Sequence, residues 1–176
     1  AQLDPLWNNG NYYDQEKQPT ESLALAMQMM NVAAFHAGFF ERVYPRETMK
    51  DQENLESVTG QTTFEKALNA VVMQSVPYTD LNHWIYTCRM CINYDVSRPY
   101  GGDLDKALSR IRAKVLAVPC RQDALHPWEF ITWVTDRINT LGGNAESYIL
   151  DSDYGHMAGI LRTDLFAEKV REFLDN

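Results

Sequence analysis

Two side chains that can work together in acid–base chemistry follow two short apolar segments of this chain. Asp123 comes after the segment Lys114–Val118, and His156 comes after the segment Ser147–Leu150. An aspartate beside a histidine fixes the imidazole tautomer and stabilises the charge that the ring gains when it accepts a proton. The pattern therefore predicts a catalytic Asp–His pair. The alternative is that Asp123 caps the helix after it and His156 is a loop histidine.

The segments around these residues have the pattern of a strand–helix–strand unit. Both apolar segments read as β-strands, and a helical pattern from about Pro127 to Leu141 joins them. A crossover of this kind predicts two parallel strands. Ligands and catalytic groups collect at the C-terminal edge of such a sheet. Asp123 and His156 are therefore expected side by side.

The preceding part of the chain is expected to be helical. A loop over residues 1–20 leads into predicted helices over 21–40, 62–75 and 81–93, and residues 41–60 are expected to form a solvated loop or short helix. After a Pro/Gly-rich hinge at 97–102, Asp103 is expected to cap a short helix over 104–111, and a closing helix is predicted over 163–174. These elements predict an all-helical region, residues 1–108, and an α/β region, residues 109–176.

The bulk properties of the chain exclude some classes of partner. A formal charge of −8 disfavours binding to nucleic acid or to an anionic membrane surface, both of which need a basic face. No run approaches the roughly 20 apolar residues of a membrane span. The first residues lack a signal-peptide pattern, and the odd number of cysteines, three, fits a reducing compartment. A cytoplasmic protein that binds neither nucleic acid nor membrane is predicted.

A C-x-x-C pattern at Cys88 and Cys91 raises the question of a metal. The two thiols are one turn apart on a predicted helix, and a zinc site would need two further ligands. Cys120 and His83 are the nearby candidates by residue type. Two cysteines packed on a helix is the favoured interpretation, so no metal site is predicted.

Two stretches resemble a known enzyme family. VLAVPCRQDALHP, from Val115 to Pro127, and DSDYGHMAG, from Asp151 to Gly159, resemble the homoserine O-acetyltransferase family of α/β-hydrolase-fold enzymes. Leu3–Tyr13 and Ser22–Ala26 are similar to that family's lid region. The resemblance implies an α/β fold class: the C-terminal portion of an α/β-hydrolase fold, two parallel strands with helices, preceded by an all-helical lid.

The resemblance also implies a reaction. In this fold the triad runs Ser, then Asp or Glu, then His along the chain, and Asp123 and His156 fill the second and third places. The serine place is empty, because no G-x-S-x-G occurs in the 176 residues. We therefore expect a partner, the N-terminal half of the same fold, to supply the nucleophile. Acetyl transfer from acetyl-CoA to a hydroxyl acceptor is implied, with no bound cofactor and with a homodimer formed through the lid.

Two alternatives remain beside this function. One is an esterase or other hydrolase of the same fold, in which water accepts the acyl group. The other is a non-catalytic fragment that serves dimerisation or another interaction.

The positions that would recognise homoserine depart from the family's pattern. The resemblance places an Asp directly after the catalytic His, and this chain has Met157. It also places an Arg and a Tyr seven residues apart on the first lid helix, where this chain has Met27 and Ala34. These three residues are expected to line the substrate pocket, and an uncharged acceptor is expected.

Overall fold

The computed structural model describes residues 2–45 and 57–175, and the chain divides into two compact units. The helical unit comprises Ala1–Val32 and Glu41–Tyr94, and the α/β unit comprises Ala33–Phe40 and Asp95–Asn176. The division into residues 1–108 and 109–176 stays a prediction. Part of the predicted 41–60 loop, residues 46–56, lies outside the described residues.

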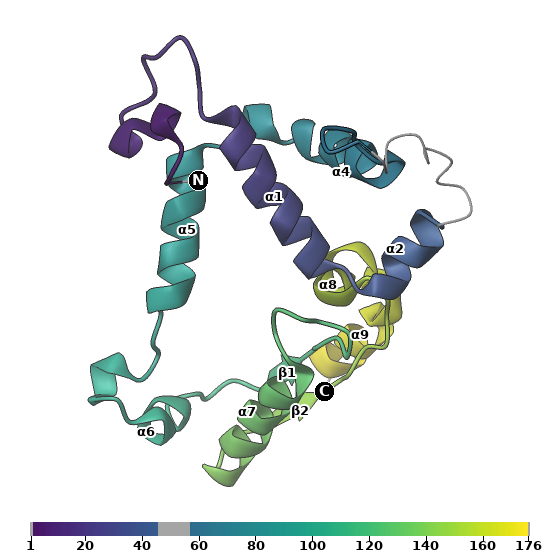
Figure 1. Ribbon diagram of the computed structural model, residues 1–176. Helices are drawn as coiled ribbons and strands as arrows, with labels where there is room; N and C mark the ends of the chain where they lie inside the picture. The colour runs from purple at the N-terminus through teal and green to yellow at the C-terminus, as the bar shows by residue number, and fades with distance from the viewer. Residues whose placement is uncertain (1, 46–56, 176) are drawn as a thin grey trace. The chain divides into compact units, whose positions relative to one another are not determined.

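The helical unit is built from helices that the sequence signals locally. Thr62 and Glu65 form a reciprocal capping box at the start of α4, and the Asp80 side chain accepts from the His83 amide at the start of α5. The observed bounds agree with the helices predicted over 62–75 and 81–93. The elements are η1 (Pro5–Gly10), α1 (Thr20–Ala34, whose last two residues belong to the α/β unit), α2 (Ala37–Val43, which crosses between the units), α4 (Thr63–Met73), η3 (Val76–Tyr78) and α5 (Leu81–Asn93) (Figure 1).

The single helix predicted over 21–40 is wrong. The chain leaves the helix at Phe35 and His36 and begins a new one at Ala37. The His36 amide donates to the Asp153 carbonyl oxygen at 3.1 Å, instead of to the preceding turn of its own helix. A hydrogen bond to a distant segment therefore ends α1, which a local pattern cannot indicate.

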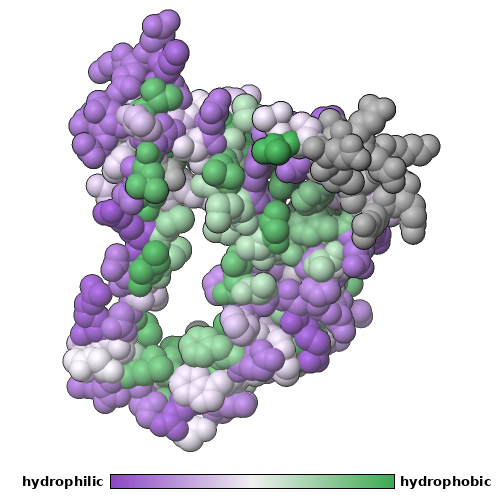
Figure 2. All heavy atoms as spheres, in the orientation of Figure 1, coloured by the Kyte–Doolittle hydropathy of each residue, from purple (hydrophilic) through white to green (hydrophobic). Residues whose placement is uncertain are grey.

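The core of the helical unit is small and centres on Tyr12. The Tyr12 hydroxyl donates to Asp80 Oδ2 at 2.5 Å and accepts from the Leu81 amide at 3.0 Å, so it ties the N-terminal segment to the start of α5. Many other apolar side chains on α1 and α5 are exposed, among them Met29 and Ile92. Figure 2 shows this hydrophobic surface in green. The buried core residues are Tyr12, Leu23, Ala24, Met27, Val72, Val76 and Leu81.

The α/β unit contains the predicted parallel strands. β1 (Val115–Ala117) pairs with β2 (Ala145–Ser147) in parallel, with Val115 opposite Ala145, and an isolated bridge joins Cys120 to Leu150. The second strand starts two residues earlier than predicted and ends at Ser147, three residues before the predicted end at Leu150. The other elements are η4 (Arg98–Tyr100), α6 (Leu104–Leu108), α7 (Trp128–Thr140), η5 (Gly155–Met157), α8 (Ala158–Leu161), η6 (Thr163–Leu165) and α9 (Ala167–Asp175).

The helix between the strands holds them in place. α7 packs along β1 and β2 (Figure 1), and Ile138 of α7 is buried against Leu108 and Ala145. Asn139 Nδ2 donates to the Ala145 carbonyl oxygen, and Asn139 Oδ1 accepts from the Ala145 amide, both at 2.7 Å. This pair of bonds connects the last turn of α7 to the start of β2. Asp103 caps α6 as predicted.

No single helix in the described ranges is long and apolar enough to cross a membrane. Within residues 2–45 and 57–175, one bent pair, α1 with α2, reaches the required length and hydropathy when its two helices are taken together.

Candidate active site

Two loops that leave the ends of the strands carry Asp123 and His156. The loops begin where strand-type pairing ends. The last two bonds of this pairing run from the Leu150 amide to the Pro119 carbonyl oxygen, at 2.8 Å, and from the Arg121 amide to the Leu150 carbonyl oxygen, at 2.9 Å. The Asp123 amide then donates back to the Cys120 carbonyl at 3.1 Å and closes a turn. Parallel pairing thus brings both loops to one edge of the sheet.

Gln122 connects the two loops through its side chain. Its Oε1 accepts from the Ser152 amide at 2.9 Å, and its Nε2 donates to Asp151 Oδ1. Cys120 Sγ, which is buried, contacts the Ser152 carbonyl oxygen at 3.4 Å. These bonds fix the distance between the loop that carries Asp123 and the loop that carries His156.

Gly155 allows a close approach of three segments next to His156. Its φ of +56° lies in the left-handed region that favours glycine. A Cβ at this position would lie 2.9 Å from the Ala34 carbonyl oxygen, and 3.1 Å from both the Gln122 carbonyl oxygen and the His36 amide nitrogen. The backbone packing around this glycine therefore sets the position of the following histidine.

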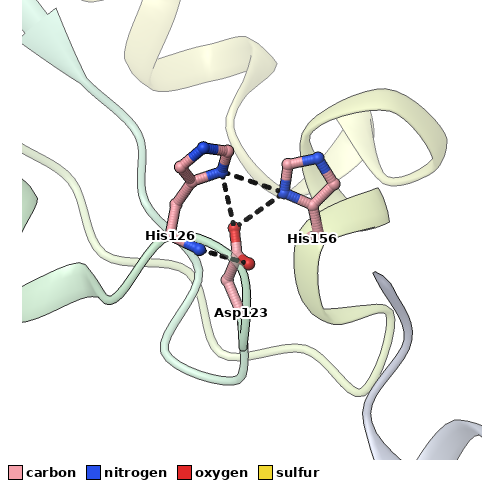
Figure 3. Close-up of side chains that lie close together, drawn as sticks. All are labelled: Asp123, His126 and His156. Atoms are coloured by element: carbon pink, nitrogen blue, oxygen red, sulfur yellow. Dashed lines mark hydrogen bonds and ion pairs between the residues drawn. The ribbon is translucent and has the colours of Figure 1, made fainter. Parts of the chain in front are cut away.

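Asp123 and His156 form the predicted pair (Figure 3). His156 Nδ1 lies 3.0 Å from Asp123 Oδ2, and the second ring nitrogen of His156 points away from the carboxylate. Because a carboxylate only accepts, Nδ1 carries the proton in this contact. That tautomer leaves Nε2 with its lone pair, as a general base requires.

The Asp123 carboxylate is held as a partly buried anion. Its side chain is 9% exposed, and its Oδ1 accepts from the amides of Leu125 at 2.8 Å and His126 at 2.9 Å. Burial raises the pKa of this carboxyl, but the hydrogen bonds from the His126 amide, the His156 ring and the Leu125 amide outweigh it. The net effect lowers the pKa of Asp123. Asp123 does not cap α7, whose N-cap is Pro127 with no side-chain hydrogen bond; it holds the turn before that helix instead. A catalytic role of Asp123 stays a prediction.

His126 is a third group at this site that the sequence analysis did not single out. Its Nδ1 lies 3.2 Å from His156 Nδ1 and 3.9 Å from Asp123 Oδ2, and its side chain is 65% exposed. The available signal was its position three residues after Asp123, in the turn before α7. That spacing alone does not show that the ring meets a histidine 30 residues further on.

A cavity of about 290 Å³ lies beside these three side chains. Its other walls are mainly apolar: Val118, Pro119, Cys120, Ile131 and Gly159. The cavity is open to solvent: the His156 side chain is 33% exposed, so water partly screens the interaction between the carboxylate and an imidazolium. The arrangement can accept a proton from a group placed in this cavity.

The three predicted pocket residues have separate environments. Ala34 is buried, and its carbonyl oxygen is among the close neighbours of Gly155; half-buried Met157 follows His156 directly. Met27 is buried in the core of the helical unit. A role of these residues in substrate binding stays a prediction.

Known proteins similar to this chain are acyltransferases and esterases. Homoserine O-acetyltransferase from Geobacter metallireducens is 28% identical over 172 residues, 98% of this chain and 45% of that protein. The crystal structure of homoserine O-acetyltransferase from Bacillus anthracis matches with a TM-score of 0.90 at 38% identity, over 99% of this chain and 46% of that one. The crystal structure of esterase E22 matches with a TM-score of 0.88 at 23% identity, over 98% and 47% of the two chains, and shares the fold. No protein-family model matches.

Two predictions from the sequence are confirmed: the resemblance to homoserine O-acetyltransferases and the fold class. The chain has the C-terminal portion of an α/β-hydrolase fold. The chain spans about half the length of the curated relatives that it matches.

Proposed function

Because this chain resembles homoserine O-acetyltransferases over nearly its whole length and has their α/β-hydrolase fold, we propose that it is part of an acyltransferase or ester hydrolase. Asp123 and His156 are the second and third members of a Ser–Asp–His triad. The serine belongs to the half of the fold that precedes this chain in the relatives. The acyl donor is acetyl-CoA, as the resemblance implies.

The first half-reaction transfers the acyl group to the serine. The serine Oγ attacks the acyl carbonyl carbon, and its proton passes to His156 Nε2. Asp123 stabilises the imidazolium through the contact with Nδ1. The tetrahedral intermediate collapses when His156 Nε2 returns the proton to the leaving thiolate. Backbone amides in the nucleophile-bearing half hold the negatively charged oxygen of the intermediate.

The second half-reaction decides between a transferase and a hydrolase. The oxygen of a hydroxyl acceptor, or of water, attacks the acyl-serine while its proton passes to His156 Nε2. The serine Oγ then leaves and takes that proton back. The pair Asp123–His156 serves both outcomes equally, so the acceptor is chosen by the pocket and by how well the site excludes water.

One observation carries this proposal. The His156 ring is oriented by a partly buried carboxylate whose other oxygen is already held by two backbone amides. A loop histidine with no catalytic task needs no such orientation. Perturbed carboxylates with a specific histidine partner beside a cavity are typical of functional sites.

The test is substitution of both residues in the complete enzyme, meaning this chain together with the nucleophile-bearing half. We expect Asp123→Asn to lower kcat on the order of 10⁴-fold, because the amide favours the wrong imidazole tautomer. His156→Ala should abolish labelling of the serine by a fluorophosphonate. Activity is measured with p-nitrophenyl acetate and with acetyl-CoA.

Matched controls are available in both units. Asp136→Asn changes an exposed aspartate of α7, and His83→Ala changes an exposed histidine of α5. Both controls should keep near-normal rates. If His156→Ala kept its rate and changed only the association state, the non-catalytic interaction fragment would be the better description.

The acceptor is a separate proposal. Met27, Ala34 and Met157 replace the charged and polar groups that the resemblance implies for homoserine, so we propose an uncharged acceptor. The complete enzyme is offered homoserine and a small uncharged alcohol at equal concentration, and the acetylated products are quantified. The alcohol ester should dominate. A large excess of O-acetylhomoserine would contradict this assignment.

A further inference from the structure

Three potential metal ligands converge at the candidate active site. One atom each of Asp123, His126 and His156 lies within 4.8 Å of the other two. Figure 3 shows the three atoms facing a common centre: Asp123 Oδ2 and Nδ1 of both rings. The separations are 3.0 Å for Asp123–His156, 3.2 Å for His126–His156 and 3.9 Å for Asp123–His126.

These separations fit a zinc ion. Zinc binds imidazole nitrogen and carboxylate oxygen at about 2.0–2.2 Å, so two ligand atoms of a tetrahedral site are about 3.4 Å apart. The three measured separations lie on both sides of that value. Small rotations of the His126 ring, which is 65% exposed, change the longest of them without disturbing the core.

The surroundings of the ligands also suit a metal. Asp123 Oδ1 is held by two backbone amides, which orients Oδ2 toward the two rings. Partners of this kind orient metal-bound side chains in known sites. Two imidazoles and one carboxylate are a ligand set that zinc accepts, and the adjoining cavity leaves a fourth position open to water or another small ligand.

We propose that Asp123, His126 and His156 form a zinc-binding site with one open coordination position, and that zinc bound there inhibits the enzyme. His126 is not a member of the proposed Ser–Asp–His triad. Its ring adds a third ligand to the Asp123–His156 pair.

The inhibition follows from the tautomer that the metal requires. Zinc takes the lone pair of His156 Nδ1, so the neutral ring must carry its proton on Nε2. Nε2 then has no lone pair to accept the serine proton, and Asp123 Oδ2 is occupied by the metal. This consequence rests on the proposed triad, whereas binding of the metal does not.

The experiment measures zinc affinity directly. All variants of the complete enzyme carry Cys88→Ser and Cys91→Ser, so that the thiols of α5 do not bind the metal. Zinc is titrated in competition with a chromophoric chelator. Removing a residue that only hydrogen-bonds to a metal ligand lowers metal affinity about 10–100-fold. Because His126 is proposed as a ligand itself, His126→Gln should weaken zinc binding at least about tenfold. His83→Gln, which removes an exposed histidine elsewhere, should not.

Two further measurements separate the claims. Zinc-edge X-ray absorption on the protein with all its histidines should show two imidazole ligands with oxygen and no sulfur, which does not depend on how a variant folds. Inhibition of ester hydrolysis by zinc should need at least about tenfold more metal in His126→Gln.

The outcomes distinguish the site from the triad. Equal affinity in His126→Gln and His83→Gln, or one imidazole in the absorption spectrum, would overturn the site. Tight binding with an unchanged rate of hydrolysis would overturn the inhibition. Failure of Asp123→Asn to lower the metal-free rate would overturn the triad and leave the zinc site standing.

Discussion

Gly155 is the residue whose replacement should disturb the site most without touching a reacting group. Alanine at φ +56° adopts a left-handed conformation that costs roughly 1–2 kcal/mol. Its Cβ would also lie 2.9 Å from the Ala34 carbonyl oxygen, which is backbone and cannot rotate away. We expect Gly155→Ala to lower the free energy of unfolding by about 2 kcal/mol or more. Urea denaturation followed by circular dichroism measures this.

Gly159 provides the matched control. It lies in α8, and a Cβ there would meet nothing within 4 Å. Gly159→Ala should therefore be neutral or stabilise the protein by up to about 1 kcal/mol, because alanine favours the helix. Equal destabilisation by the two alanines would show that close packing at Gly155 is unimportant.

At this scale the sequence predicted part of the site. Asp123 and His156 were found because strand ends are recognisable and because the fold brings the ends of parallel strands together. His126 was not predicted. Its Nδ1 approaches that of His156, 30 residues further along the chain, only because of how the two loops pack. The hydrogen bonds through which Gln122 joins the two loops were not predicted either, because they also depend on how the loops pack.

Among the elements, α5 has at its N-terminus a partly buried hydrogen bond, from Tyr12 to Asp80, that should make stability pH-dependent. Burial is the largest cause that raises the pKa of Tyr12 to about 12, followed by its hydrogen bond to Asp80. An unfolded tyrosine titrates near pH 10. A raised folded pKa means that the stabilisation is complete below pH 10 and is lost as pH rises toward 12.

Tyr12→Phe tests this assignment. Between pH 9 and pH 11 the free energy of unfolding of the unmodified protein should fall by about 1 kcal/mol more than that of Tyr12→Phe. Urea denaturation at the two pH values measures the difference. Tyr78→Phe, at a side chain that is 90% exposed, should behave like the unmodified protein. A fall of the same size in Tyr12→Phe would assign the pH dependence to other groups.

Local signals were sufficient for most helices and insufficient for their interruptions. The capping box at Thr62 and the caps at Asp80 and Asp103 are visible in the sequence, and α4, α5 and α6 begin where these predict. The break after Ala34 depends on the Asp153 carbonyl, which is far along the chain. No periodicity within residues 21–40 carries that information.

At the scale of the whole molecule, the two-stranded sheet is incompletely covered. Parallel strands are usually buried on both faces, yet Val115, Leu116 and Ala117 of β1 are all only half-buried. Phe130 and Trp133 of α7 are exposed. Apolar surface of this kind marks an interaction site or an aggregation hazard.

We therefore expect this chain, expressed by itself, to bind the dye ANS and to self-associate in sedimentation velocity. Under the proposed function, adding the nucleophile-bearing half should reduce both, because its strands and helices would cover the exposed sheet. A monomeric chain that binds no ANS would contradict the need for this partner.

Gln122 has a consequence for how an active enzyme forms. The bonds that hold the Asp123 and His156 loops together all lie within the α/β unit, so the pair is in place before any serine arrives. At concentrations low enough to keep the chain monomeric, recovery of activity after mixing the two halves should then be second order, with a rate set by the product of their concentrations. Replacing Gln122 with alanine should add a slower step whose rate does not change with concentration.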